Sequence, residues 1–152
     1  MTNRGTLHLR RGEAPSKVGE HWRVEGGDFA GSFDHEGGAY LLVLARERPT
    51  TLMNWMDGRA WASALTVARH RDFRLPTLRE SAALVESFPG LCLAPEYWLW
   101  TEDTVLDVFD EDLRMRAWRR YQGGHESPLK KTFTGTIVGV RVVKLGDELG
   151  IR

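Results

Sequence analysis

The chain has one cysteine among its 152 residues, and this scarcity limits the chemistry that it can perform. Cys92 has no second thiol for an internal disulfide, and metal or redox sites that need two thiolates are excluded as well. We therefore expect Cys92 to be a small buried hydrophobe between Leu91 and Leu93 rather than a reactive thiol.

An excess of either charge is also lacking, because 21 basic side chains balance 21 acidic ones. No net field draws the chain toward nucleic acid or an anionic membrane, so we expect neither as a direct partner. No hydrophobic run approaches the roughly 18 residues of a membrane span. The polar segment from Met1 to Pro15 has no apolar core of the kind found in secretory signals. The sequence thus predicts cytosolic synthesis, although a virion component would look the same.

Recognisable catalytic motifs are missing too. The chain has no Gly-Lys-Ser/Thr phosphate loop and no Gly-x-Ser-x-Gly elbow, and its five histidines are scattered without the spacing of metal ligands. No triplet typical of calcium-dependent sugar sites is present, and the carboxylates between Asp107 and Asp112 are more typical of a solvated surface. We predict a non-enzymatic protein without a metal or cofactor, and keep an enzyme as the less favoured alternative.

The composition is that of a soluble globular domain, with 41% hydrophobic and 28% charged residues. A chain of this length can bury roughly two thirds of the surface that it exposes when unfolded, which is enough for one core. The first residues show no sustained periodicity. We predict a flexible N-terminal arm over residues 1–17 and a single domain over residues 18–152.

Local patterns predict a hairpin followed by two helices. Strands over Phe29 to Phe33 and Ala39 to Ala45 flank a glycine-containing loop. A first helix, Trp55 to Ala68, has Asn54 as its cap and Trp61 as its main core anchor. A second helix begins at the capping box Thr77-Leu78-Arg79-Glu80 and ends at Pro89-Gly90.

The pattern then returns to strands, at residues 97–101, 115–121 and 137–144. Gly123-Gly124 and Ser127-Pro128 are predicted as turns between them. This order of strands, two helices and strands indicates an α+β domain in which the terminal segments pair in one antiparallel sheet.

Several motifs occur in an order found in one known family. From the N-terminus these motifs are Val18-Gly19-Glu20-His21-Trp22, Gly26-Gly27-Asp28-Phe29-Ala30-Gly31, Trp61-Ala62, Phe73-Arg74-Leu75-Pro76-Thr77 with Glu80, Tyr97-Trp98 followed by Thr101-Glu102, and Val140-Arg141-Val142-Val143. Over about Val18 to Lys144 the chain resembles the Lcl C-terminal domain family, and in particular its phage and prophage members. The resemblance implies a C-type-lectin-like fold, a twisted antiparallel sheet with two flanking helices. It does not imply sugar binding.

The chain departs from that family after Tyr97-Trp98. Leu99 and Trp100 stand where small residues are usual, and residues 103–116 form an acidic and apolar insertion. Loops of this kind carry specificity on a rigid scaffold, so we expect the insertion to help select the partner.

Contact candidates follow from strand alternation, which places Trp118 on the same face as Arg116 and Arg120. Tryptophan beside arginine is the composition of interface hot spots. The predicted contact residues are Trp100, Arg116, Trp118, Arg120 and Tyr121, with the acidic insertion around Asp107 and Asp110 as a second patch. The alternative is that the aromatic residues are core and the arginines pair with these carboxylates.

The sequence therefore predicts a phage- or prophage-associated binding module for a macromolecule, most simply a protein, acting in the virion, as a tail accessory for example, or inside the host. One alternative is a phage inhibitor of a bacterial defence complex, comparable to an anti-CRISPR protein, whose acidic insertion would mimic nucleic-acid phosphates. Another is a lectin-like carbohydrate-binding module. Unpaired strand edges make a homo-oligomer possible in each case.

Overall fold

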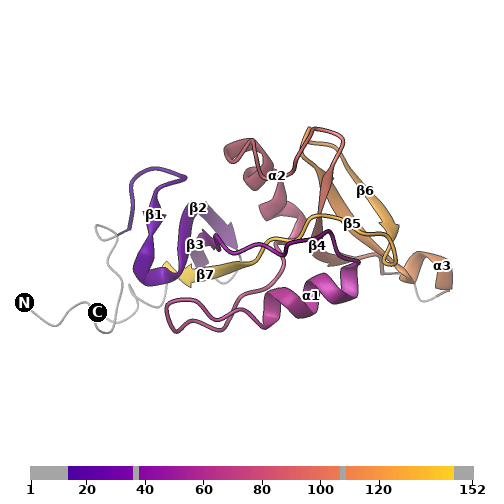
Figure 1. Ribbon diagram of the computed structural model, residues 1–152, viewed down its shortest axis with the longest axis horizontal. Coiled ribbons are helices and arrows are strands. Elements are labelled where there is room, and N and C mark those ends of the chain that lie inside the picture. The colour runs from indigo at the N-terminus through magenta and orange to yellow at the C-terminus, as the bar shows by residue number, and fades with distance from the viewer. Residues whose placement is uncertain (1–13, 36–37, 107–108, 146–152) are drawn as a thin grey trace, which may run out of the picture.

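The computed structural model describes residues 14–35, 38–106 and 109–145 (Figure 1). Residues 1–13 of the predicted arm lie outside the described part, whereas Ala14 packs against a hydrophobic cluster that contains Trp22. The elements in chain order are β1 (His21–Trp22), the 3-10 helix η3 (Arg23–Glu25), β2 (Gly27–His35), β3 (Gly38–Leu44), α1 (Trp55–Ser63), α2 (Leu78–Ser87), β4 (Trp98–Thr104), α3 (Glu111–Arg114), β5 (Arg116–Tyr121), β6 (Glu126–Lys130) and β7 (Val140–Lys144).

The described strands form two antiparallel sheets, which confirms the α+β class. The first sheet has the order β1-β2-β3-β7, and the second has the order β4-β5-β6. The predicted pairing of the terminal segments is confirmed in the first sheet, where β7 pairs with β3 from Tyr40↔Lys144 to Leu44↔Val140. The second sheet was not predicted, and the twisted single sheet that the resemblance implies is divided in two. An isolated parallel bridge, Leu99↔Thr136, links β4 to the segment that precedes β7.

The hairpin of β2 and β3 is confirmed; β2 is longer than predicted, and β3 begins and ends one residue earlier than predicted. A register shift between Phe29 and Gly31 bulges β2, and Gly31 adopts a φ of 121° that favours glycine. At the start of β2, a Cβ on Gly27 would lie 2.2 Å from the carbonyl oxygen of Leu44. Only glycine lets the two strands approach this closely.

The first helix is shorter than predicted and is anchored by a different tryptophan. Asn54 caps it as expected, since its side chain accepts a hydrogen bond from the backbone N–H of Asp57 at 2.8 Å. Helix α1 ends at Ser63, ahead of a turn in which Ala68 and Arg69 have positive φ. Trp61 is only partly buried, so the prediction that it is the main anchor is wrong. Trp55 is the buried residue, and its indole N–H donates to the Thr101 carbonyl at 2.8 Å.

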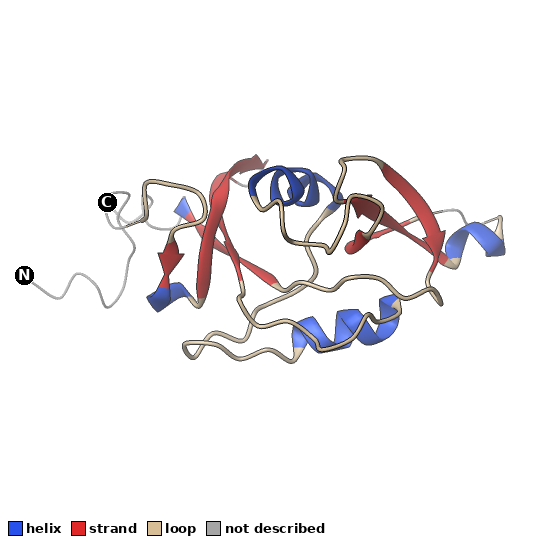
Figure 2. Ribbon diagram, turned by 45° about the horizontal axis from the view of Figure 1, so that its top comes forward, coloured by secondary structure: helices blue, strands red, loops and turns tan. Residues whose placement is uncertain are grey.

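The second helix begins as its capping box predicts. The Thr77 hydroxyl accepts from the Glu80 N–H at 3.1 Å, and the Glu80 carboxylate accepts from the Thr77 N–H at 2.9 Å. Helices α1 and α2 lie on opposite sides of the molecule, and α2 bridges the ends of the two sheets (Figures 1 and 2).

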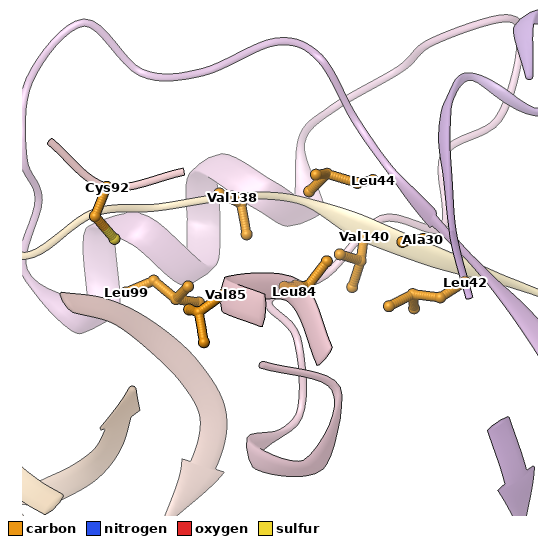
Figure 3. Close-up of a cluster of buried hydrophobic side chains, with 9 residues drawn as sticks. All are labelled: Ala30, Leu42, Leu44, Leu84, Val85, Cys92, Leu99, Val138 and Val140. Atoms are coloured by element: carbon orange, nitrogen blue, oxygen red, sulfur yellow. The ribbon is translucent and has the colours of Figure 1, made fainter. Parts of the chain in front are cut away.

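Two cores meet at β4. The first core joins α2 to the first sheet and includes Leu99 (Figure 3). The second core joins α1 to the second sheet and includes Trp100. Neighbouring residues of β4 therefore point into different cores, as strand alternation requires. Cys92 is buried in the first core, which confirms its prediction as a small hydrophobe.

Two strands were not predicted, β1 and β6. The segment Ser127-Pro128 lies within β6 rather than in a turn, and Pro128 pairs with Trp118. Because β6 is an edge strand, Pro128 removes no hydrogen bond from the interior of the sheet.

Candidate functional site

A buried polar network underlies the candidate site. Glu80 is 0% exposed and accepts hydrogen bonds from both terminal nitrogens of Arg74, at 2.8 and 3.0 Å. It also accepts one from the Tyr40 hydroxyl at 2.7 Å. Tyr40 belongs to β3 and Glu80 to α2, so the network joins the first sheet to the helix.

The network changes the acidity of its members. Burial opposes the charge on Glu80, but the hydrogen bonds and charge of Arg74 outweigh it and hold the pKa of that carboxyl below its usual range. Burial, together with the hydrogen bond to the Glu80 carboxylate, raises the pKa of Tyr40 to about 12. At neutral pH the carboxylate is therefore charged and the phenol keeps its proton.

An open cleft of about 640 Å³ lies next to this network, between α2 and the second sheet, and Tyr40 is one of its lining residues. Its walls come from β3, the N-terminal end of α2, β4, β5 and β6. We call it the cleft, and its lining residues are Tyr40, Thr77, Leu78, Arg79, Asp103, Thr104, Trp118, Arg120 and Glu126. Two of the predicted contact residues, Trp118 and Arg120, are brought together here.

Arg120 forms the floor of the cleft and is fixed by the scaffold. It is 9% exposed and donates to the Leu78 and Gly124 carbonyls at 3.0 Å each, and to the Ser81 hydroxyl at 3.1 Å. A salt bridge of 2.9 Å to Glu126 completes its contacts. Because these partners occupy its donors, Arg120 holds α2 against β5 and β6, and only part of it faces the cleft.

Arg79 is the exposed cation of the cleft. Its guanidinium lies 5.7 Å from the centre of the Phe33 ring and donates to the Asp34 carbonyl at 2.6 Å. From β4, the Asp103 carboxylate accepts a hydrogen bond from the Leu78 N–H and so caps the start of α2. The cleft thus combines one exposed arginine with the partly buried Trp118.

Trp100 is not a surface residue. It is 0% exposed, and its indole N–H donates to the Met53 carbonyl at 3.2 Å inside the second core. Its nomination as a contact residue is therefore wrong, and the core alternative holds for it. Strand alternation fixes which side of the sheet Trp100 faces, but not that α1 covers that side.

Several carboxylates in residues 103–116 already have hydrogen-bond or ion-pair partners within the chain. Asp110 caps α3 by accepting from the Leu113 N–H at 3.2 Å. Asp112 pairs with Arg116 at 3.1 Å and lies 3.8 Å from the Lys130 ammonium. Asp107 lies outside the described residues. For Arg116, the structure therefore confirms the alternative prediction that the arginines pair with the acidic residues of this segment.

The same segment nevertheless presents apolar side chains. Leu106 is 91% exposed and Phe109 is 95% exposed. Glu102, just before the segment, instead turns back to the scaffold and pairs with Arg59 of α1 at 2.9 Å.

Tyr121 belongs to the other face of the second sheet. There the Arg119 guanidinium lies 4.6 Å from the centre of the Trp98 ring and 4.7 Å from that of the Tyr121 ring. Sequence reasoning missed Trp98, Arg119 and Arg79. The alternation of Trp118, Arg119, Arg120 and Tyr121 was a signal for Arg119, because it pairs Arg119 with Tyr121 rather than with Trp118.

No group of three or more His, Cys, Asp or Glu side chains in the described residues is arranged to hold a metal ion. Burial raises the pKa of the Cys92 thiol, although a hydrogen bond with Thr136 opposes this effect. None of the helices in the described part combines the length and apolar character needed to cross a membrane.

Comparison with models of known protein families gave no match, and no curated protein matched the chain. The candidate site is therefore defined by its geometry alone.

Proposed function

We propose that this protein is a non-enzymatic binding module that recognises a protein partner through the cleft, on a C-type-lectin-like scaffold. The observation that carries the proposal is that two sheets and a helix converge on the cleft, so that Trp118 and Arg79 both line it. Tryptophan and arginine are enriched in interface hot spots, where an aromatic anchor is surrounded by polar groups.

The scaffold proposal is supported by the order of the elements. The hairpin of the first sheet pairs with the last strand, β7. Two helices follow the hairpin in the chain, and the second sheet, which has three strands, comes between these helices and β7. This arrangement is compatible with the fold implied by the family resemblance. The association with a phage or prophage rests on the same resemblance.

The preformed character of the cleft also supports binding. The Arg74–Glu80–Tyr40 network and the contacts of Arg120 hold its walls in place before any partner arrives. A partner that docks against a fixed surface loses less conformational entropy than one that must order it.

The alternative of a nucleic-acid mimic needs carboxylates that are available to a partner. Asp110 and Asp112 already contact groups of their own chain. For this reason we favour the cleft over residues 103–116 as the main contact surface.

The test is an affinity capture from host lysate with the full chain, followed by calorimetry with each captured protein. Replacing Trp118 by alanine is expected to weaken binding roughly thirtyfold, the effect of a hot-spot residue worth about 2 kcal/mol. Arg79→Glu tests the exposed cation, and Arg71→Glu is its matched control because Arg71 is exposed but does not line the cleft. Unchanged affinity in both cleft variants would contradict the proposal.

A second variant separates the insertion from the cleft. The Val105 N–H donates to the Arg116 carbonyl at 3.1 Å, so the strand ends are adjacent and residues 106–114 can be replaced by a short Gly-Ser linker. Asp103, which caps α2, is retained. We expect this variant to keep most of its affinity, since the cleft is left intact. Mass spectrometry of virions then distinguishes a virion component from a protein that acts inside the host.

A further inference from the structure

A second, smaller hollow lies at the start of β4, outside the cleft. It has a volume of about 190 Å³, the scale of one large apolar side chain, and its walls are mainly apolar. We call it the Trp98 pocket, and its lining residues are Leu52, Glu96, Tyr97, Trp98, Thr134, Gly135 and Thr136.

The walls of the Trp98 pocket are fixed by the backbone. Gly135 and Met53 exchange two hydrogen bonds, of 2.8 and 3.0 Å. The Trp98 indole packs directly on Gly135, where an added Cβ would lie 2.5 Å from the indole nitrogen. The backbone of Thr136 is hydrogen-bonded to the backbones of both Trp98 and Trp100. The pocket is therefore formed without help from a ligand.

Arg119 supplies a fixed positive charge beside this pocket. Its guanidinium contacts the rings of Trp98 and Tyr121, and its Nε donates to the Ser127 hydroxyl at 3.0 Å. Within the described residues, its two terminal nitrogens make no hydrogen bond and no carboxylate forms a salt bridge with it. A guanidinium whose two terminal nitrogens are available can bind a carboxylate through two parallel hydrogen bonds.

We infer that the Trp98 pocket and Arg119 form a docking site for a protein segment that carries a large apolar side chain next to an aspartate or glutamate. The apolar side chain fills the pocket, and the carboxylate pairs with the terminal nitrogens of Arg119. Charge complementarity favours the carboxylate, because Arg119 has no ion-pair partner among the described residues and is held in place by two aromatic rings.

This docking site goes beyond the proposed role of the cleft and can be tested separately. Trp118 and Arg120 line the cleft, whereas Arg119 alternates to the opposite face of β5. A variant of Arg119 leaves the cleft intact, and a variant of Trp118 leaves the docking site intact. Failure of one proposal is therefore distinguishable from failure of the other.

The experiment is a selection of linear 12-residue peptides from a displayed random library on the full chain. We expect the enriched peptides to share a leucine, phenylalanine or tryptophan beside an acidic residue. A synthetic peptide of the consensus sequence should lose about tenfold or more in affinity for Arg119→Ala, and Arg119→Lys should restore binding only in part. Trp118→Ala is the matched control and should bind the peptide like the unmodified chain.

Leu52→Glu is a second test that does not depend on how well the Arg119 variants fold. Leu52 is an exposed loop residue at the pocket, so a carboxylate there should repel the acidic peptide without disturbing the core. The inference is overturned if the enriched peptides lack the apolar-acidic pair, or if Arg119→Ala and Leu52→Glu both bind the consensus peptide normally. It is also overturned if sedimentation shows that a second copy of the chain occupies the site instead.

Discussion

Arg141 in the first sheet and Arg119 in the second have opposite roles. In the first sheet, Arg141 of β7 is buried and donates to Asp72 and Glu25 at 2.7 Å each, so the chain itself supplies both carboxylates. In the second sheet, Arg119 of β5 is held by two aromatic rings and a hydroxyl, and its terminal nitrogens have no partner among the described residues. The first arrangement fixes the scaffold, and the second leaves a charge for a ligand.

The same contrast applies to the faces of the sheets. Hydrophobic clusters cover both faces of the first sheet, one containing Leu42 and the other containing Val43. In the second sheet the core covers Trp100, while Trp98 and Trp118 remain partly exposed beside hollows. Recognition is therefore expected on the second sheet, and three stability measurements test this division.

The largest effect is expected when the buried tryptophan of the second sheet is removed. Trp100→Ala should lower the free energy of unfolding by about 3–5 kcal/mol, because it leaves a large cavity in the second core. Trp118→Ala should cost only about 1 kcal/mol, the usual effect of a substitution outside the core. Urea unfolding followed by circular dichroism measures both.

The pair of variants is its own control, since the same side chain is truncated on the two sides of one sheet. Equal losses would show that Trp118 is as much a part of the scaffold as Trp100. The division between the covered and the recognition surface of the second sheet would then be wrong.

An intermediate effect is expected at the network that links the first sheet to α2. Glu80→Gln removes the charge that Arg74 pairs with, and should cost about 3 kcal/mol at pH 7, the lower end for a buried pair because Arg74 is partly exposed. The pKa of Glu80 is lowered in the folded state, so its contribution is present above the usual glutamate pKa of about 4.3 and is lost as the pH falls through the lower folded value.

The difference between Glu80→Gln and the unmodified chain should therefore be largest near neutral pH and should narrow below about pH 4. Urea titrations at several pH values measure it. Glu86→Gln is the control, because Glu86 lies on the same helix but is exposed. A difference that stays constant down to pH 3 would contradict the charged pairing of Glu80 with Arg74.

Features of the fold that depend on neighbouring residues could be predicted from the sequence. The capping box at Thr77 and Glu80, the cap at Asn54 and the glycine-containing hairpin are each formed by residues close together in the chain. Their hydrogen bonds or backbone conformations are local, so the residue types alone indicate them.

Features that depend on long-range packing could not be predicted. The burial of Trp100 follows from the position of α1 over the second sheet, and the separation of the sheets follows from the course of residues 134–140 between them. The strand β6 was concealed by Pro128, which is acceptable only because β6 lies at an edge. At the site, alternation indicates which residues share a face, but not which face the chain leaves open.

The smallest of the three effects is expected where α1 meets the segment that joins the two sheets. Gly58 lies inside α1, and a Cβ there would fall 2.0 Å from the Cδ1 atom of Ile137, a buried residue of the second core. Gly58→Ala therefore forces Ile137 to shift, and we expect a loss of about 1–3 kcal/mol from overpacking, which exceeds the gain in helix propensity. Gly90→Ala is the matched control, since nothing lies within 4 Å of its added Cβ. Thermal unfolding measures both, with about 2–4 °C expected for each kcal/mol. If Gly58→Ala unfolds at the same temperature as Gly90→Ala, then Ile137 has room to move. The contact between α1 and the segment that joins the two sheets would then be loosely packed.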